Sequence, residues 1–453
     1  MKIGKATKAA AVALAVLALL PILASCSHEH VFTEWQTDEK THSRSCTAGR
    51  CDVTEAGEHT FDAGTVTKEA EVGAPGVMTY TCTVCGYSYT AEIPEKQGIV
   101  LNEFEEFDTH TPLQKKYLAD SVDSVNKYAE GVLEQSTQGT PVFKWALSGV
   151  PEDTELLKYT LYLSPNEDFE GAKTYSSRYF EYDRSRGFDF LIKTRYYWKV
   201  TANLRAADGS EFTLESKVSS FMTLDGPRTL DVDGVANFRD LGGKECEGGV
   251  IRQNLIFRCG RLNPNYSKTP SITSSGKKKL VELGIRAEID FRGSVNDAGL
   301  YQNGFKADGS EPMTSWGGDQ IRYYLCPAVY HDTILSDAEG KKMVKDTFAI
   351  LADPDNYPLI FHCSIGTDRT GVIAFLIECV CGVDYEVMAR DYLFSNFANI
   401  GSKRTYERFT TVMAPVRAAS GSTYREKATN YLTKIGVPLE QIESVREILV
   451  EKN

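Results

Sequence analysis

The chain has 453 residues, of which 42% are hydrophobic and 25% charged, and its formal net charge at pH 7 is -12. This length allows more than one domain, and the composition is ordinary for globular protein. The negative charge argues against nucleic acid and anionic membranes as general partners, because like charges repel. It does not exclude a local phosphate site.

The first 26 residues predict export. Three lysines within the first eight residues precede an uninterrupted apolar run over residues 9–20, a pattern typical of a signal peptide and too short for a confident membrane span. The sequence Leu23-Ala24-Ser25-Cys26 resembles a bacterial lipobox, in which the cysteine is lipidated. The alternative is an ordinary cleaved signal peptide with a chance cysteine. We predict a lipoprotein signal peptide over 1–26, and a chain lipid-anchored through Cys26 at the outer face of the bacterial membrane.

Residues 27–97 form a small module that is rich in cysteine and histidine and poor in leucine and isoleucine, so it cannot bury much core unaided. Its cysteines form two pairs, and histidines lie before or between them: Cys46, Cys51, Cys82 and Cys85, with His28, His30, His42 and His59. The Cys-x-x-Cys-Gly sequence of the second pair is typical of a zinc knuckle. Two disulfides are the competing prediction in an exported protein. The module resembles Cys-paired repeats of exported bacterial surface proteins, so we expect a structural or spacer role.

Residues 98–138 have some helical character, as in 113–133, and we predict a connector helix there. Residues 139–225 predict an antiparallel β-sandwich, because apolar and polar residues alternate along short segments separated by turn residues. The apolar positions of three such strands are Phe143, Trp145, Leu147, Tyr159, Leu161, Leu163, Tyr196, Trp198 and Val200. We interpret these aromatic residues as sandwich core rather than as a carbohydrate-binding surface. The run 195–202 resembles a fibronectin type III strand.

Strand and helix patterns alternate over residues 226–453. Strands are expected at 255–258, 287–291, 321–325 and 359–361, and helices at 274–283, 341–351 and from about Thr370 to Gly382. This alternation predicts an α/β domain with a mainly parallel sheet. Ligands bind such sheets at the carboxyl ends of their strands.

The stretch His362-Cys363-Ser364-Ile365-Gly366-Thr367-Asp368-Arg369-Thr370-Gly371 joins the last strand to an apolar helix. A short loop entering a helix directs backbone N–H groups at an anion, and Arg369 can close over a phosphate with a bidentate fork. The same field favours a Cys363 thiolate, which is a nucleophile. Thr370 can bond the sulfur, and Asp368 is a candidate proton donor. The alternative, a buried structural cysteine beside a helix cap, does not explain the whole string.

This loop resembles the signature of the cysteine-dependent protein tyrosine phosphatase superfamily, and in particular of the bacterial secreted tyrosine and lipid phosphatases. Four further stretches match in order: 237–243 (Asn-Phe-Arg-Asp-Leu-Gly-Gly), 256–262 and 284–292 before the loop, and 391–396 after it. The resemblance covers the C-terminal half. It implies catalytic roles for Cys363, Arg369, Asp368, Thr370 and His362, and substrate contacts from Ser364, Ile365, Gly366, Thr367 and Asp240. For Asp240, a turn-stabilising role is the alternative, and structural ion pairs are expected for Arg258, Asp290 and Arg292.

Two departures from the relatives affect the mechanism and the substrate. Many relatives carry the acid on a separate loop, where this chain has Ala328 and, later, Asp332, so Asp368 is the favoured acid and Asp332 the alternative. Relatives that act on phosphoinositides often carry a lysine at the position of Thr367, which disfavours highly charged inositol lipids.

The sequence therefore predicts a phosphate monoester hydrolase that forms a phosphocysteine, with phosphotyrosine in a protein as the leading substrate. No metal is expected in catalysis, because Arg369 and the backbone neutralise the phosphate. The alternatives are a phosphoinositide or inositol phosphate phosphatase, and a surface binding protein that does not turn over its ligand.

Overall fold

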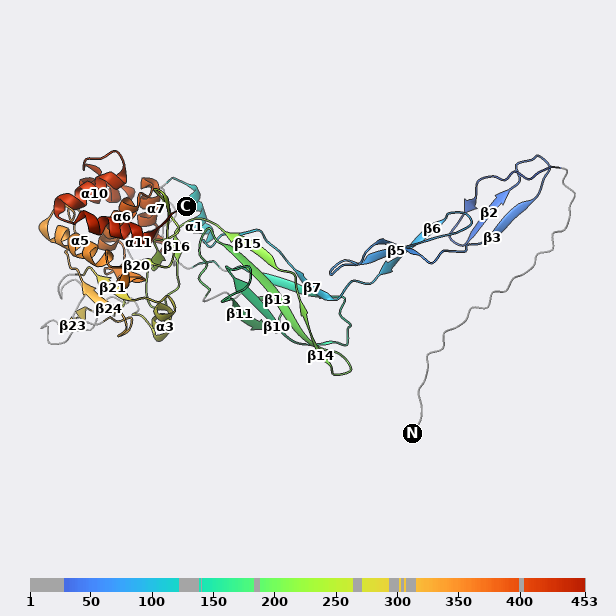
Figure 1. The fold of residues 1–453 in the computed structure, drawn as a ribbon, viewed down its shortest axis with the longest axis horizontal. Coiled ribbons are helices and arrows are strands. Elements are labelled where there is room, and N and C mark those ends of the chain that lie inside the picture. Colours follow the sequence, from blue (N-terminus) through green and yellow to red (C-terminus); the bar gives the residue numbers. More distant parts are fainter. Residues whose placement is uncertain are drawn as a thin grey trace, which may run out of the picture. The chain divides into compact units, whose positions relative to one another are not determined.

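The computed structural model describes residues 28–121, 138–139, 141–182, 188–263, 271–292, 301–302, 305–306, 315–398 and 403–452. The predicted signal peptide and Cys26 lie outside these residues. Within them, no helix is both long and apolar enough to cross a membrane. The chain divides into two compact units, one ending at Gln97 and one spanning Gly98–Asn453 (Figure 1).

The first unit consists of two three-stranded antiparallel sheets with few buried side chains. Their strands are β1 (Gln36–Thr37), β2 (Thr41–Ser45) and β3 (Thr54–Glu58), then β4 (Thr65–Lys68), β5 (Gly76–Thr81) and β6 (Ser88–Ile93). The two cysteine pairs occupy the β2–β3 and β5–β6 connections. Because these sheets bury so little apolar area, the hydrophobic effect contributes little to their stability.

The second unit begins with a β-sandwich. One sheet has the order β12-β9-β7 and the other β11-β10-β13-β15-β8, with β14 also paired to β13. The strands are β7 (Gly98–Leu101), β8 (Glu106–Phe107), β9 (Phe143–Ser148), β10 (Glu155–Ser164), β11 (Lys173–Ser177), β12 (Glu181–Tyr182), β13 (Arg195–Arg205), β14 (Glu211–Glu215) and β15 (Ser219–Thr223). The predicted apolar positions form its core, and of these only Leu147 is half-buried. The core interpretation is therefore confirmed.

The predicted connector helix over 98–138 is wrong for its first part. Residues of β7 and β8 pair with β9 and β15, so this segment supplies strands to both sheets. The only helix among its described residues is α1 (Pro112–Ala119), which begins with a capping box between Thr111 and Gln114. Residues 122–137 of the predicted helix lie outside the described part. Tyr117 of α1 is buried, and the carbonyl of Asp120 accepts a hydrogen bond from Arg390 at 2.8 Å.

The remaining residues form the predicted α/β domain, whose sheet has the order β16-β17-β20-β25-β21-β24. Strands β20, β25, β21 and β24 are mutually parallel, while β16 and β17 are antiparallel to their neighbours. The strands are β16 (Arg228–Thr229), β17 (Arg239–Asp240), β20 (Ile256–Cys259), β21 (Ala287–Asp290), β24 (Arg322–Leu325) and β25 (Leu359–His362). A second sheet joins β18 (Glu245–Cys246), β19 (Gly249–Ile251) and β26 (Val450–Lys452), and β22 (Tyr301–Gln302) pairs with β23 (Phe305–Lys306). The predicted mainly parallel sheet is confirmed.

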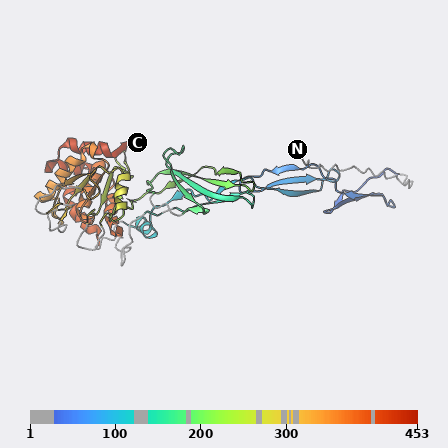
Figure 2. The ribbon, with the colours of Figure 1, turned by 90° about the horizontal axis from the view of Figure 1, so that it is seen from below.

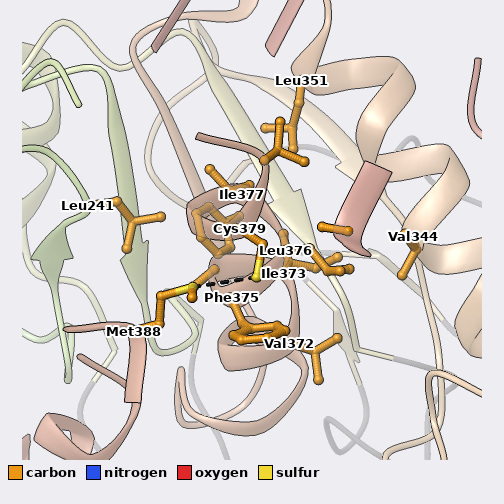
Figure 3. Packing of buried hydrophobic residues seen from close by; sticks show 14 of the residues in the cluster. Leu241, Val344, Leu351, Val372, Ile373, Phe375, Leu376, Ile377, Cys379 and Met388 are labelled. Carbon is orange, nitrogen blue, oxygen red and sulfur yellow. Dashed lines mark hydrogen bonds between the residues drawn. The ribbon is translucent and has the colours of Figure 1, made fainter. Parts of the chain in front are cut away.

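Helix α6 (Asp368–Cys381) is the central helix of this domain, and almost every side chain on it is buried. It packs against β20, β25, α7 (Tyr385–Phe394), α10 (Tyr424–Ile435) and α11 (Leu439–Leu449). Its apolar side chains meet a shell of others: Val372, Ile373, Phe375, Leu376, Ile377 and Cys379 pack with Leu241, Val344, Leu351 and Met388 (Figure 3). A helix that is apolar on all sides must be enclosed, and this enclosure fixes the position of its N-terminus.

The other helices of this domain complete its two cores. They are α3 (Ser274–Glu282), α5 (Ala338–Leu351), α8 (Tyr406–Val412), α9 (Ala414–Arg417) and two short 3-10 turns, η2 (Pro354–Asn356) and η3 (Ser395–Ala398). Leu280 of α3 packs in a cluster separate from the one around α6. Figure 2 shows the domain from a second side. Thr273, Asp337 and Thr405 cap α3, α5 and α8 through side-chain oxygens, as the first turn of a helix requires.

Candidate active site

The central feature is the loop between β25 and α6. Strand β25 ends at His362, and α6 begins at Asp368 with no side-chain hydrogen bond from its N-cap residue, Thr367. Cys363 is 2% exposed, whereas Ser364, Ile365 and Asp368 are half-buried. The first amides of an α-helix lack intrahelical acceptors, so an uncapped N-terminus favours an anion beside Cys363.

Gly366 permits the sharp bend of this loop. Its φ is +71°, and a Cβ there would lie 2.3 Å from the carbonyl oxygen of Cys259. Both observations require glycine. The loop can therefore pass close to β20 only with this residue.

Cys363 is poised to ionise. Burial disfavours the thiolate, and Asp368 also opposes it, but the Arg369 guanidinium and the hydroxyl and amide of Thr370 outweigh them and lower the pKa of the thiol. Arg369 is held in place because its Nη1 donates to the carbonyls of Ala328 at 2.8 Å and Phe291 at 3.2 Å. The predicted nucleophile therefore lies in one site with Arg369 and Thr370, whose buried hydroxyl makes no other hydrogen bond among the described residues.

Three side chains bind the outer, carbonyl side of the loop. Asn237, itself at φ +58°, donates to the carbonyls of Ile365 at 3.2 Å and Gly366 at 3.0 Å. Arg258 donates to Gly366 O at 2.9 Å, and Arg261 to Ser364 O at 3.0 Å. Because C=O and N–H point in opposite directions across a trans peptide, these contacts leave the amide side of the loop facing the anion position.

Asp391 holds Arg258 in position, and we call Asn237, Arg258 and Asp391 together the brace of the loop. Asp391 lies 2.6 Å from Arg258 and 3.4 Å from Arg239, with Lys244 at 3.6 Å, and all four side chains are buried. Burial would raise the pKa of Asp391, but the three cations hold it well below its usual value. The predicted ion-pair role of Arg258 is confirmed. The sequence match around Asn237 and Asp391 thus marks the residues that shape the loop.

His362 lies behind the loop rather than in it. Its Nε2 is 2.8 Å from Glu288 and its Nδ1–H donates to Cys363 O at 3.2 Å, with the side chain fully buried. Burial opposes protonation, yet Asp290 and Glu288 raise the pKa of His362. His362 was predicted as catalytic, but this geometry makes it a positioning residue for Cys363.

Glu288, Asp290 and His362 bring three potential metal ligands within 4.8 Å of one another. Arg292 chelates Asp290 with both ends of its guanidinium, as predicted for an ion pair, and Tyr323 donates to the same carboxylate at 2.9 Å. Although burial opposes it, Arg292 holds the pKa of Asp290 at about 2. A protonated His362 and the Arg292 guanidinium therefore balance the two carboxylates of Glu288 and Asp290. These contacts support the loop and leave no excess negative charge for a metal ion.

Asp240, predicted to contact substrate, lies in a different set of contacts. Its carboxylate binds Arg228 at 2.6 Å and accepts from the amides of Gly242 and Asn254, each at 2.7 Å, and it is fully buried. The structure supports the alternative interpretation, in which Asp240 stabilises the turn before the two glycines.

The two acid candidates are both paired with arginines near α8. Arg404 contacts both oxygens of Asp368 at 2.7 Å, and the exposed Asp332 lies 3.4 Å from Arg408. Asp368 is the first residue of α6 and next to Arg369, whereas Asp332 follows the segment whose Ala328 carbonyl binds Arg369. Arg404 therefore fixes the orientation of the favoured acid.

Sequence reasoning did not single out Arg261. Its side chain is buried and Nη1 binds Ser364 O, but Nε and Nη2 find no hydrogen-bond acceptor among the described residues. Burial and repulsion by Arg292 lower the pKa of Arg261 to about 10, although Cys363 attracts it. One available clue was its position just beyond the carboxyl end of β20, next to β25, where parallel sheets bind ligands.

Comparisons with known proteins agree with this geometry. Residues 230–451 match the Tyrosine phosphatase family. A predicted tyrosine-protein phosphatase of Cupriavidus necator is 27% identical over 194 residues, which cover 40% of this chain and 68% of that protein.

Two solved structures are more distant. The core catalytic domain of the PP-IP phosphatase SIW14 from S. cerevisiae is 14% identical, with a TM-score of 0.24, over 36% of this chain and 87% of that one. The chicken CNTN1 FN1–FN3 domains are 8% identical, with a TM-score of 0.13, over 52% and 76%. At these scores neither structure bears on the function of this chain, and the fibronectin-like character of 139–225 stays a prediction.

A parallel α/β sheet that presents a buried cysteine, an arginine and an uncapped helix at one loop defines a cysteine-dependent phosphoester hydrolase. The C-terminal domain of the chain, over residues 230–451, belongs to the Tyrosine phosphatase family.

Proposed function

We propose that the C-terminal domain hydrolyses phosphate monoesters through a phosphocysteine on Cys363, with phosphotyrosine in proteins as its substrate. The observation that carries this proposal is the placement of a buried cysteine at the uncapped N-terminus of α6, next to Arg369, an arrangement that lowers the pKa of the thiol. A tyrosine ester suits this site because an aryl oxygen leaves more readily than an alkyl oxygen.

In the first step the Cys363 thiolate attacks phosphorus, so that an S–P bond forms as the bond to the ester oxygen breaks. Asp368, in its protonated form, gives its proton to the departing oxygen. Arg369 and the loop amides bind the three equatorial oxygens, whose charge they neutralise in the transition state. Arg404 contacts both oxygens of Asp368 in this structure, so one oxygen must leave Arg404 to carry the proton.

In the second step water attacks phosphorus on the side opposite sulfur. Asp368, now ionised, takes the proton from this water, and the S–P bond breaks. The thiolate returns to the site where Arg369 and Thr370 stabilise it. The enzyme is thereby restored with Asp368 protonated, and inorganic phosphate leaves.

A second candidate substrate is an ester with more than one phosphate, such as an inositol phosphate or phosphoinositide. Arg261 favours it, because two of its buried guanidinium nitrogens have no acceptor among the described residues and can meet additional anionic oxygens. Thr367 counts against it, since it adds no charge to the loop.

The test measures phosphate release by the full chain from phosphotyrosine peptides, phosphoserine peptides, inositol phosphates and phosphoinositides. We expect the highest kcat/KM with phosphotyrosine. Cys363→Ser should lower kcat by about 10⁴-fold or more while the chain still binds the ester. Turnover that survives in this variant would refute the phosphocysteine, and a higher kcat/KM for inositol phosphates would establish the second substrate class.

We also propose that the chain is exported and lipid-anchored through Cys26, on the basis of the lipobox-like sequence. Cys26→Ser should move the protein from the membrane fraction to the medium or to the soluble extracytoplasmic fraction. Retention of the variant in the membrane fraction would contradict the anchor.

Finally, we propose that the small module binds structural zinc through the cysteines already named, Cys46, Cys51, Cys82 and Cys85. Support comes from the two groups of cysteine and histidine side chains that the structure brings together. Zinc content of the purified chain, measured by mass spectrometry, tests this proposal against two disulfides.

A further inference from the structure

The small module brings its cysteines together with histidines in two separate groups. One contains His28, His30, Cys46 and Cys51, and the other His42, His59, Cys82 and Cys85. Within each group the potential ligand atoms all lie within 4.8 Å of one another. All four cysteines are thiols rather than disulfides.

The distances in the first group fit a tetrahedral zinc ion. A Zn–S bond of about 2.3 Å and a Zn–N bond of about 2.0–2.1 Å place sulfur and nitrogen ligands about 3.6 Å apart. Cys46 Sγ lies 3.5 Å from His28 Nε2, and Cys51 Sγ lies 3.5 Å from His30 Nδ1. A disulfide would instead require the two sulfurs to be about 2.05 Å apart.

The second group has the same dimensions. Cys85 Sγ is 3.4 Å from His59 Nδ1, and Cys82 Sγ is 3.8 Å from His42 Nδ1. The Nδ1 atoms of the two histidines are 3.5 Å apart, close to the roughly 3.3 Å expected for two nitrogen ligands of one zinc ion.

His59 is also oriented as a ligand should be. Its Nε2–H donates to the carbonyl of Asp38 at 2.9 Å, which leaves Nδ1 as the lone-pair nitrogen that faces the cysteines. Its ring stacks on Tyr87 with centroids 4.7 Å apart. These contacts fix both the tautomer and the ring plane before any metal binds.

The two groups are copies of one local design. Phe32 bridges to Cys46 and Phe61 to Cys82, in each case two residues after a histidine ligand. The residue after each bridging cysteine donates its amide to the residue between histidine and phenylalanine, as Thr47 to Val31 at 2.8 Å and Thr83 to Thr60 at 2.9 Å. Equivalent backbone contacts around both groups argue for equivalent occupants.

We propose that the module holds two zinc ions, each in its own site of two thiolates and two imidazoles. This inference rests on the zinc binding proposed above and adds the stoichiometry and the four histidine ligands. It excludes a single site of four cysteines. Each ion replaces part of the core that the two thin sheets lack, because metal binding supplies folding free energy directly.

The test counts zinc ions in the purified full chain by mass spectrometry and compares variants of each group. We expect two ions per chain in the natural sequence and one in His59→Gln, Cys82→Ser, His30→Gln and Cys46→Ser. The matched controls, His331→Gln and Cys246→Ser, change a histidine and a cysteine outside both groups and should retain two. Replacement of zinc by Co²⁺ should give the visible spectrum of tetrahedral sites with thiolate ligands, at half the intensity in each variant.

The outcomes separate the two proposals. One ion that survives His59→Gln and His30→Gln but is lost in both cysteine variants would overturn the two-site inference and leave zinc binding intact. Loss of both ions in every variant would overturn the independence of the sites. If the chain contains no zinc and its mass is lower than that of the fully reduced chain by two hydrogens for each cysteine pair, the pairs are disulfides. That result would overturn zinc binding itself.

Discussion

Cysteine has opposite surroundings in the two units of this chain. In the first unit, the paired cysteines lie in strand connections of sheets that bury few apolar side chains. In the second, Cys363 lies beneath a helix enclosed by the largest core of the molecule. A thiolate needs a compensating charge in both places, and the two units supply it differently. The catalytic domain uses a guanidinium and backbone amides that a rigid core holds in position, whereas the proposed zinc ions supply both the charge and the rigidity.

Removal of zinc gives the largest expected difference between the units. A strong chelator should unfold residues 28–97, because structural zinc contributes on the order of 10 kcal/mol to such modules, and phosphate release by the second unit should not change. Circular dichroism and hydrogen exchange measure the unfolding of the first unit, and the phosphate-release assay measures the activity of the second. Loss of activity upon chelation would show that catalysis also depends on the metal.

Replacement of the proposed acid tests which aspartate of the second unit donates the proton. Asp368→Asn should lower kcat by about 10²- to 10⁴-fold, because it removes the proton donor while keeping the shape of the side chain. Asp332→Asn is the matched control and should change kcat by less than about threefold. A reversed order would transfer the acid role to Asp332, and a poor leaving group should enlarge the effect of whichever residue is the acid.

Arg261→Met should have a smaller effect, which depends on the substrate. Hydrogen bonds to charged groups contribute about 1.5–3 kcal/mol, so kcat/KM should fall by roughly 10- to 100-fold for an ester with additional phosphates and less for phosphotyrosine. Arg261→Lys keeps the charge and controls for its loss. Equal losses for all substrates would assign Arg261 to loop support through Ser364 rather than to substrate binding.

The smallest expected effect is a pH dependence of stability from His362. Its pKa is raised in the folded domain, so the folded state binds the proton more tightly. The stabilisation is complete below the unfolded value of about 6.5 and is lost as pH rises through the folded pKa. Urea denaturation of the natural chain and of His362→Gln should therefore give midpoints that converge as the pH rises. A constant difference between them would contradict a protonated His362.

The fold of the catalytic domain was predictable because its strands and helices carry strong local patterns. The nucleophile and Arg369 lie in one continuous stretch, so the local turn from strand to helix is enough to bring them to one site. Arg261 and Arg404 could not be found in this way, since the fold brings them to the loop from about 100 residues before it and 36 residues after Asp368. The strand at 98–101 was missed because its apolar run, Ile99-Val100-Leu101, is short and its partner strand comes later in the chain.

The histidine ligands show the same limit in the first unit. Their number and proximity to the cysteines were visible in the sequence, but the division into two groups was not. His42 belongs with Cys82 and Cys85, although Cys46 and Cys51 are nearer in sequence. The position of His42 in the second group is visible only in the three-dimensional structure.

The brace that Asn237, Arg258 and Asp391 form around the catalytic loop has a consequence for the timing of activity. These residues are spread over more than 150 positions of the chain, and the loop takes its anion-binding shape only when all of them have reached it. An incompletely folded chain therefore carries an ordinary thiol at Cys363 and does not yet hold the site that would make it a nucleophile. The enzyme becomes reactive only where the polypeptide completes its folding.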